Sequence, residues 1–223
     1  MAFNFQTFKT RTLTAAVFVI VMLAGLLWNF WSFLILVTVI HFGCWYEFVK
    51  LMKKIYGEKY LRYCRFGLIY ITMPLMMLII LYNNLISFYG AFIPCLILFS
   101  IWINDTMAYL VGSFIGKTPL SKISPKKTVE GTLGGIVLCI LIIGMLSYFR
   151  NPEKEVIFFS MIIAALCAIF GTVGDLFESK LKRMADVKDS GSFMPGHGGF
   201  LDRFDSLLFA APAVWVYVYF FIK

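Results

Sequence analysis

The chain has 223 residues, of which 61% are hydrophobic and 14% are charged, whereas soluble domains are roughly 45–50% apolar and about 25% charged. A globule of this length cannot hide such an apolar excess in its core and still keep a polar surface. The composition argues against a soluble enzyme, a disordered or collagen-like chain and a disulfide scaffold, and it predicts an integral membrane protein.

The formal net charge is +8, from 20 Lys and Arg residues against 12 Asp and Glu residues. In a soluble protein this excess suggests nucleic-acid binding, whereas in a membrane protein basic residues mark cytoplasmic loops. The five cysteines lack CxxC spacing, so we expect them to be buried without a chemical role. Two histidines are too few for a multi-histidine metal site.

Seven apolar runs follow one another along the chain, each close to the roughly 20 residues that a helix needs to cross a bilayer. They cover residues 12–28, 30–47, 66–82, 86–104, 131–149, 156–174 and 206–222. Trp28-Asn29-Phe30-Trp31 predicts an interfacial turn between the first two runs, and we expect the first run to be retained rather than cleaved as a signal peptide. Residues 105–116 either extend the fourth helix or form a half-helix.

The basic residues predict the topology of these helices. With the N-terminus inside, all but three of the 20 basic residues fall on the cytoplasmic side, and the exceptions are Arg150, Lys154 and Lys223. This distribution satisfies the positive-inside rule. The sequence thus predicts an all-α polytopic membrane protein with about seven transmembrane helices, within a range of six to nine, and a cytoplasmic N-terminus.

The acidic residues indicate where chemistry takes place. We expect Glu153 and Glu155 to be solvated in an outer loop, and Glu47 and Glu58 to balance the lysines around them. The other eight lie in two cytoplasmic stretches, as Asp105, Glu130, Asp175, Glu178, Asp186, Asp189, Asp202 and Asp205. Ionisable groups at the ends of apolar helices are costly and tend to mark ion or substrate sites.

The second stretch combines several features. If the sixth helix continues, Asp175, Ser179 and Lys182 share one face, and Asp202 and Asp205 follow at i, i+3 where the seventh begins. Glycines between these helices permit close backbone approach to a ligand, helix N-termini favour phosphate, and carboxylates from two helices suit Mg²⁺. Each feature alone has a plain explanation: a turn, a helix cap, a topology signal or a structural histidine. Their coincidence within about thirty residues predicts a site.

The first stretch adds Asn104-Asp-Thr106 and Ser124-Pro-Lys126-Lys127-Thr-Val-Glu-Gly131. The second of these motifs reads either as a helix start with phosphate-binding lysines or as a basic topology signal with a capping threonine. Gly112-Ser-Phe-Ile-Gly-Lys-Thr118 is one residue short of a Walker A loop and follows no strand, so we reject it. The glycosylation sequon at Asn104 falls on the predicted cytoplasmic side and is discounted.

With these motifs the chain resembles the phosphatidate cytidylyltransferase (CDP-diacylglycerol synthase) family over roughly residues 100–210. The signature reads Ser179-Lys-Leu-Lys182-Arg183, four residues, then Lys188-Asp189-Ser-Gly-Ser-Phe-Met194-Pro-Gly-His197-Gly198-Gly199-Phe-Leu-Asp202-Arg203-Phe-Asp205. Met194 stands where an aliphatic or branched residue is usual. The first three spans match the family only in being membrane helices.

The resemblance implies that phosphatidic acid and CTP give CDP-diacylglycerol and pyrophosphate, with Mg²⁺ and a possible second, monovalent cation. It divides the chain into N-terminal transmembrane helices, 1–100, and a catalytic transmembrane region, 101–223. It implies a bacterial inner membrane, a site facing the cytoplasm, a lipid bilayer as partner, no nucleic acid, and a homodimer as one assembly.

The resemblance also implies roles for individual residues. The metal ligands are Asp175 and Asp202, with Asp105, Asp189 and Asp205 as additional or supporting ligands. The catalytic set is Lys182, Arg183, Lys188, Asp189, His197, Arg203 and Asp205. The substrate-binding set is Asn104, Asp105, Lys126, Lys127, Ser179, Gly198 and Gly199.

The residues suit this chemistry on their own terms. The nucleophile is a lipid phosphate oxygen that is already ionised, so no Ser-His-Asp unit is needed, and the obstacle is repulsion between two polyanions. Two alternatives remain. One is a transporter for an anionic metabolite, disfavoured because the acids cluster at one face and no inverted repeat is visible. The other is a CTP-dependent kinase acting on a polyprenol or phytol alcohol, which would need a base.

Overall fold

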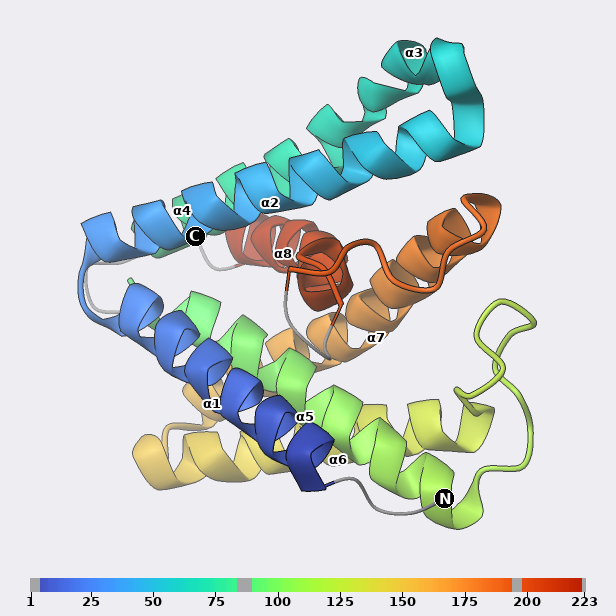
Figure 1. The fold of residues 1–223 in the computed structure, drawn as a ribbon. Coiled ribbons are helices and arrows are strands. Elements are labelled where there is room, and N and C mark those ends of the chain that lie inside the picture. The colour runs from blue at the N-terminus through green and yellow to red at the C-terminus, as the bar shows by residue number, and fades with distance from the viewer. Residues whose placement is uncertain (1–4, 84–89, 194–197, 222–223) are drawn as a thin grey trace. The chain divides into compact units, whose positions relative to one another are not determined.

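The computed structural model describes residues 5–83, 90–193 and 198–221, and it shows helices joined by short loops (Figure 1). The α-helices are α1 (Phe5–Leu27), α2 (Phe30–Tyr56), α3 (Tyr60–Cys64), α4 (Met73–Asn83), α5 (Phe92–Ile115), α6 (Val129–Arg150), α7 (Lys154–Met184) and α8 (Leu201–Phe221). A 3₁₀ turn, Gly57–Lys59, precedes α3, and a π-helical turn, Leu68–Thr72, precedes α4. Within the described ranges no β-strand forms, as the sequence predicts.

Among the residues that the structure describes, five helical segments are long and apolar enough to cross a membrane: Phe30–Cys64, Phe92–Ile115, Val129–Arg150, Lys154–Met184 and Leu201–Phe221. Two shorter apolar helices, Thr12–Leu27 and Leu68–Tyr82, stand where two further spans are predicted. The helical architecture therefore fits an integral membrane protein. The number of spans and the side of the N-terminus stay predictions.

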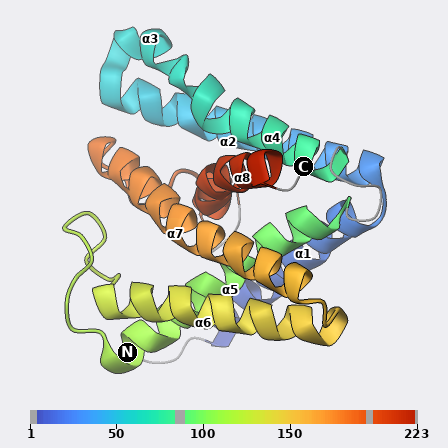
Figure 2. The ribbon, with the colours of Figure 1, turned by 180° about the vertical axis from the view of Figure 1, so that it is seen from behind.

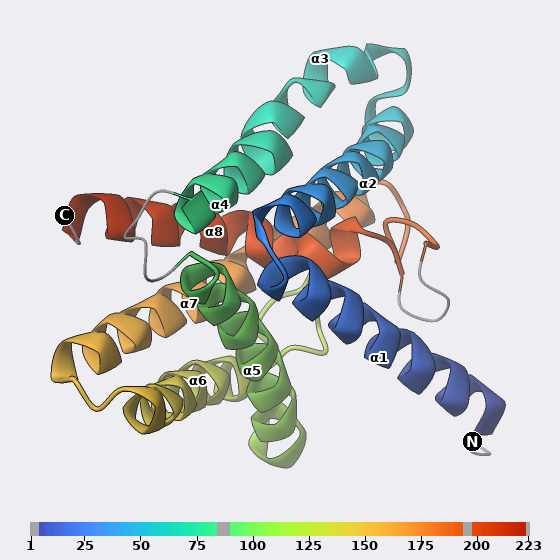
Figure 3. The ribbon, with the colours of Figure 1, turned by 90° about the vertical axis from the view of Figure 1, so that its left-hand side faces the viewer.

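The first two helices meet in a tight turn, as the sequence predicts (Figure 3). Asn29 is the N-cap of α2: its side chain accepts a bond of 2.9 Å from the Ser32 amide, and the Ser32 hydroxyl accepts one of 3.0 Å from the Asn29 amide. Trp28 and Trp31 flank this cap and are 80% and 70% exposed. Two exposed indoles at a helix turn are typical of the membrane–water interface.

Helix α5 begins at Phe92 and continues to Ile115, so residues 105–115 extend the fourth helix, which is one of the two alternatives that the sequence left open. No proline interrupts the chain between Asp105 and Gly116, and the helix ends only where Gly116 leaves the helical conformation and Pro119 follows. Asp105 is therefore a helix residue and not part of a loop. Residues 84–89, at the predicted start of this run, lie outside the described residues.

Helix α7 is 31 residues long and includes Asp175, Ser179 and Lys182. The three residues therefore share one helix face, as the sequence predicts for a helix that continues this far. The helix ends at Met184, and Asp186, two residues further on, is a non-glycine residue with a φ of 52°. The Asp186 amide bonds to the Arg183 carbonyl and the Val187 amide to the Lys182 carbonyl, at 3.1 and 2.9 Å. This pattern is a Schellman motif, in which aspartate tolerates the left-handed position better than most residues.

The chain divides into two compact units. Unit 1 comprises Met1–Leu75 and Leu181–Phe204, and unit 2 comprises Met76–Lys180 and Asp205–Lys223. These units follow packing, so each draws on both sides of the division at residue 100. That division is one of role and stays a prediction.

Unit 2 is built on the antiparallel pair α5 and α6 (Figure 2). A Cβ at Gly135 would lie 2.7 Å from the Cβ of Ala108, and one at Gly131 would lie 2.7 Å from the Ala108 carbonyl oxygen. Only glycine permits this approach, so the GxxxG spacing of α6 packs two helices of the same chain.

Candidate active site

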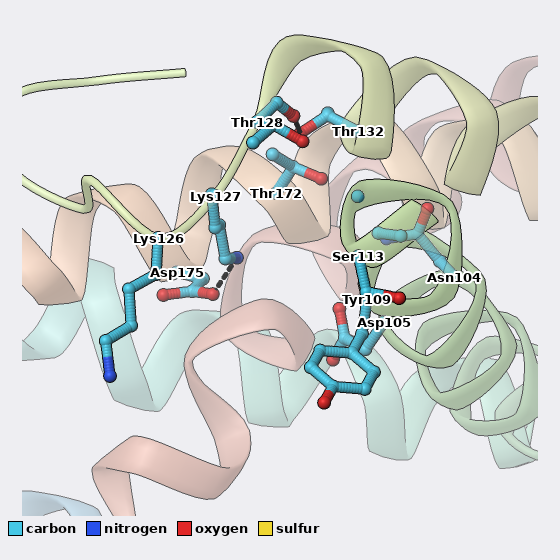
Figure 4. A pocket seen from close by; sticks show the side chains of 12 residues that line it. Asn104, Asp105, Tyr109, Ser113, Lys126, Lys127, Thr128, Thr132, Thr172 and Asp175 are labelled. Carbon is cyan, nitrogen blue, oxygen red and sulfur yellow. Dashed lines mark hydrogen bonds and ion pairs between the residues drawn. The ribbon is translucent and has the colours of Figure 1, made fainter. Parts of the chain in front are cut away.

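Unit 2 contains a cavity of about 430 Å³ between α5, α6, α7 and the loop before α6 (Figure 4). Its walls carry charged and polar side chains, two of them carboxylates and two of them lysines. The lining residues are Asn104, Asp105, Ala108, Tyr109, Gly112, Ser113, Lys126, Lys127, Thr128, Thr132, Thr172 and Asp175. The cavity thus gathers five residues of the predicted site: Asn104, Asp105, Lys126, Lys127 and Asp175.

The loop that carries the two lysines is held at both ends. Thr128 is the N-cap of α6, and its hydroxyl accepts a bond of 3.1 Å from the Gly131 amide. Glu130 reaches back across the loop and accepts bonds from the Lys117 and Thr118 amides and, at 2.8 Å, from the Thr118 hydroxyl. Thr128 is therefore the helix cap that this motif predicts, and Glu130 fixes the loop. The role of the two lysines stays a prediction.

Asp175 forms an ion pair with Lys127, and the Ser179 hydroxyl donates to Asp175 at 3.3 Å. The side chains of Lys127 and Asp175 remain 32% and 26% exposed. In Figure 4 these two side chains point toward each other, whereas the Lys126 side chain points away from the pair. An accessible pair beside a cavity can exchange partners with an incoming anion or cation.

The side-chain oxygens of this cavity are suitable ligands for a magnesium ion that also binds a phosphate group. Asp105 on α5 and Asp175 on α7 line the same cavity. The buried side-chain oxygen of Asn104, Oδ1, has no hydrogen-bond partner. Mg²⁺ commonly takes one or two carboxylates and completes its shell with water and substrate phosphate. In the described part of the chain no three His, Cys, Asp or Glu side chains gather as a metal cluster, which this mode of binding does not require.

In unit 1, Asp202 lies in the first turn of α8 at the centre of a polar cluster. Its Oδ1 accepts from Lys182 Nζ at 2.6 Å, and its Oδ2 accepts from the Ser190 and Gly199 amides at 2.9 and 2.8 Å. The Ser190 hydroxyl lies 2.9 Å from the same oxygen. The Lys182 and Asp202 side chains are only 12% and 8% exposed.

The sequence predicts that the glycines next to this cluster let the backbone approach a ligand closely. In the structure, the group that the backbone at Gly198 approaches is the Asp202 side chain. Gly198 has a φ of 86°, and a Cβ there would lie 2.7 Å from Asp202 Oδ2. The backbone therefore closes on the protein's own carboxylate. His197, together with Met194 of the signature, lies outside the described residues.

Glu47 is the residue that sequence reasoning missed. It lies on α2, is 3% exposed, and has its two oxygens 2.9 Å from the Phe200 and Leu201 amides. The Ser190 hydroxyl lies 2.6 Å from Glu47 Oε2. The expectation that Glu47 merely balances nearby lysines is wrong. A usable signal was that no acidic residue precedes it in an apolar segment of this length, because an acid retained there is costly.

The remaining predicted residues occupy varied places. Arg183 donates to the Val187 carbonyl at 3.3 Å and so closes the end of α7. Lys188, Asp189 and Arg203 are exposed, and the buried Asp205 accepts from the Ser206 amide at 2.6 Å.

Four polar residues of the cavity were not singled out from the sequence: Tyr109, Ser113, Thr132 and Thr172. Tyr109 and Ser113 follow Asp105 at helical spacing, so only a continuous α5 reveals them.

Comparison with known proteins identifies the family of this chain. The sequence model of the cytidylyltransferase family matches residues 58–221, so this chain belongs to the cytidylyltransferase family. It is 47% identical over 116 residues to a phosphatidate cytidylyltransferase of Bacillus subtilis, covering 52% of this chain and 43% of that protein. It is 45% identical over 131 residues to the one of Synechocystis, covering 58% and 44%.

A third relative, the phosphatidate cytidylyltransferase of Thermotoga maritima, is 40% identical over 155 residues, covering 67% of this chain and 56% of that protein. The chain therefore spans only about half the length of the curated relatives it matches.

Proposed function

We propose that this chain is a phosphatidate cytidylyltransferase, which joins CTP to phosphatidic acid and releases pyrophosphate. The observation that carries the proposal is the cavity of unit 2, where lysines and carboxylates from three segments face one space. Membership of the cytidylyltransferase family and the names of the relatives support the same activity.

The reaction forms one bond and breaks one. An ionised oxygen of the lipid phosphate attacks the α-phosphorus of CTP, and the bond from that phosphorus to the oxygen bridging the β-phosphorus breaks, so pyrophosphate leaves. No general base is needed. The difficulty is the meeting of two polyanions, and such phosphoryl-type transfers depend on positioning and electrostatic stabilisation.

The basic residues supply that stabilisation. Lys126 and Lys127 would neutralise phosphate oxygens at the cavity of unit 2, and Thr128 and Glu130 hold the loop that presents them. The pairing of Lys127 with Asp175 keeps both groups in place until an anion takes the lysine. In unit 1, Lys182 takes the corresponding place beside Asp202.

The acids would hold the metal. When bound, Mg²⁺ supplies charge neutralisation on the reacting and departing phosphate oxygens. The residues proposed to hold it are Asp175, beside Asp105 on the same cavity, and Asp202 in its own unit. A second, monovalent cation belongs to the proposal, with no side chains assigned to it.

The location follows from the substrates. Phosphatidic acid is held in a bilayer and CTP is dissolved in the cytoplasm, so we place the site at the cytoplasmic face of a bacterial inner membrane. The distribution of basic residues supports this side. A homodimer is part of the proposal, and the mass of the protein in detergent tests it.

The deciding experiment incubates the purified chain with phosphatidic acid vesicles, α-labelled CTP and Mg²⁺. We expect label in a lipid-extractable product, with pyrophosphate in equal amount, and loss of the reaction when EDTA removes the cation. Label in CDP together with a new lipid phosphate would instead indicate a kinase. Absence of any lipid product, with labelled anion taken up into vesicles that contain the protein, would indicate a transporter.

A further inference from the structure

The buried carboxylate of Glu47 lies outside every part of the proposed mechanism described so far. Its oxygens lie 2.6 Å from the Ser190 hydroxyl and 2.9 Å from the Phe200 and Leu201 amides. These groups lie more than 140 residues away along the chain. One side chain of α2 thus joins two separate pieces of the signature in unit 1.

The backbone around Glu47 is shaped to receive it. A Cβ at Gly191 would lie 2.1 Å from Glu47 Oε1, and one at Gly199 would lie 2.2 Å from Oε2. Real Cβ atoms do not approach so closely, so a side chain at either position would displace the Glu47 carboxylate from its partners. The absence of side chains at Gly191 and Gly199 therefore makes room for the Glu47 carboxylate.

Burial of a carboxylate is costly, and its contacts here are with a hydroxyl and two backbone amides. A buried ionisable group on an apolar helix is a weak source of stability and a strong sign of function. The function must act through the groups that Glu47 holds.

Those groups lead directly to Asp202. The Ser190 hydroxyl that touches Glu47 also lies 2.9 Å from Asp202 Oδ2. Phe200 and Leu201, whose amides Glu47 binds, are the two residues before Asp202 in the chain. Glu47 therefore fixes both the backbone from which Asp202 projects and a hydroxyl that faces its carboxylate.

We propose that Glu47 is a positioning residue that sets the place of the Asp202 carboxylate for the reaction. This inference rests on the proposed function, since Asp202 matters to the reaction only if that function holds. Glu47 itself touches no substrate in this account and acts through Ser190 and the start of α8.

The test compares Glu47→Gln with Glu58→Gln, an exposed glutamate outside the site. The amide of Gln places a donor against a donor, so Glu47→Gln should lower kcat about tenfold or more. KM for phosphatidic acid should stay within about twofold, because uniform substrate binding is untouched. The Mg²⁺ concentration for half-maximal rate should rise, and the Phe200 and Leu201 amides should exchange hydrogen faster. Glu58→Gln should match the parent chain in every measurement.

A purely structural role predicts something else: a lower melting temperature, with the kcat of the folded fraction unchanged. That result, or a kcat within twofold of the parent, overturns the inference. If Glu47→Gln does not fold, Ser190→Ala decides, because it removes only the hydroxyl between the two acids. A lower kcat at unchanged melting temperature supports the inference, and an unchanged kcat overturns it. If the parent chain makes no CDP-lipid, the proposed function fails first, and with it this role.

Discussion

Two lysine–carboxylate pairs of this molecule have the same chemistry and differ in how far they are buried. Lys127 and Asp175, in unit 2, are 32% and 26% exposed beside a cavity. Lys182 and Asp202, in unit 1, are 12% and 8% exposed, and backbone amides complete the shell of the acid.

The difference shows what each pair can do. The pair of unit 2 is half-buried and is the more exposed of the two, so it contributes about 0–1 kcal/mol to stability and can open at little cost. A buried pair is costly to break from one side, because the remaining charge stays in a poor solvent. The first pair can therefore exchange partners at little cost, whereas the second can do so only when a new partner replaces the charge that is lost.

The largest expected effect is on the stability of the buried pair. Lys182→Met leaves the Asp202 carboxylate with its amide donors but without a cation, and we expect a loss of about 3 kcal/mol. The midpoint of thermal unfolding in detergent measures it. Lys188→Met, at an exposed lysine of the same region, should leave that midpoint unchanged. Equal midpoints for the two variants would remove the distinction between the pairs.

The exposed pair should respond in activity rather than in stability. Asp175→Asn should lower kcat about 100-fold or more, since it removes the charge that pairs with Lys127 and that we propose to bind the metal. Its melting temperature should stay within a few degrees, because an exposed pair contributes so little. Steady-state assays and thermal unfolding give the two numbers. Lys122→Met, at an exposed lysine of the same loop, is the control. Near-parental CDP-lipid formation by Asp175→Asn would remove this residue from the metal site.

The smallest effect concerns the glycine that closes on Asp202. Gly57 and Gly198 both have positive φ, but a Cβ at Gly57 meets nothing within 4 Å, whereas one at Gly198 meets Asp202. Alanine at either position costs about 1–3 kcal/mol of backbone strain. Only Gly198→Ala should also lower kcat. Comparison of unfolding midpoints and rates for the two variants separates strain from displacement of the acid, and equal rates would contradict the close contact.

The sequence predicts well whatever depends on helical periodicity. Asp175, Ser179 and Lys182 share a face because α7 continues, and Asp202 and Asp205 open α8 as their spacing indicates. Thr128 caps α6 because threonine before an apolar helix is a local signal.

Periodicity fails where tertiary contact decides. Glu47 looks like a solvated acid among lysines, and only folding brings Ser190 and Gly199 to it. The sequence left open whether residues 105–116 continue the fourth helix, because the apolar run stops at residue 104 although the helix does not. Helix ends depend on breakers such as Gly116 and Pro119, and hydrophobicity alone does not locate them.

The Ser190 hydroxyl carries one hydrogen and lies between two carboxylates, those of Glu47 and Asp202. Its oxygen lies 2.6 Å from Glu47 and 2.9 Å from Asp202, yet it can donate to only one of them at a time. Whichever acid goes without keeps its amide donors: Ser190 and Gly199 for Asp202, Phe200 and Leu201 for Glu47. The hydroxyl can therefore rotate between the acids without stranding either one. A cation bound at Asp202 would favour the orientation in which the Ser190 hydroxyl donates its hydrogen to Glu47. The orientation of this buried hydroxyl in unit 1 would therefore depend on whether a cation is bound at Asp202.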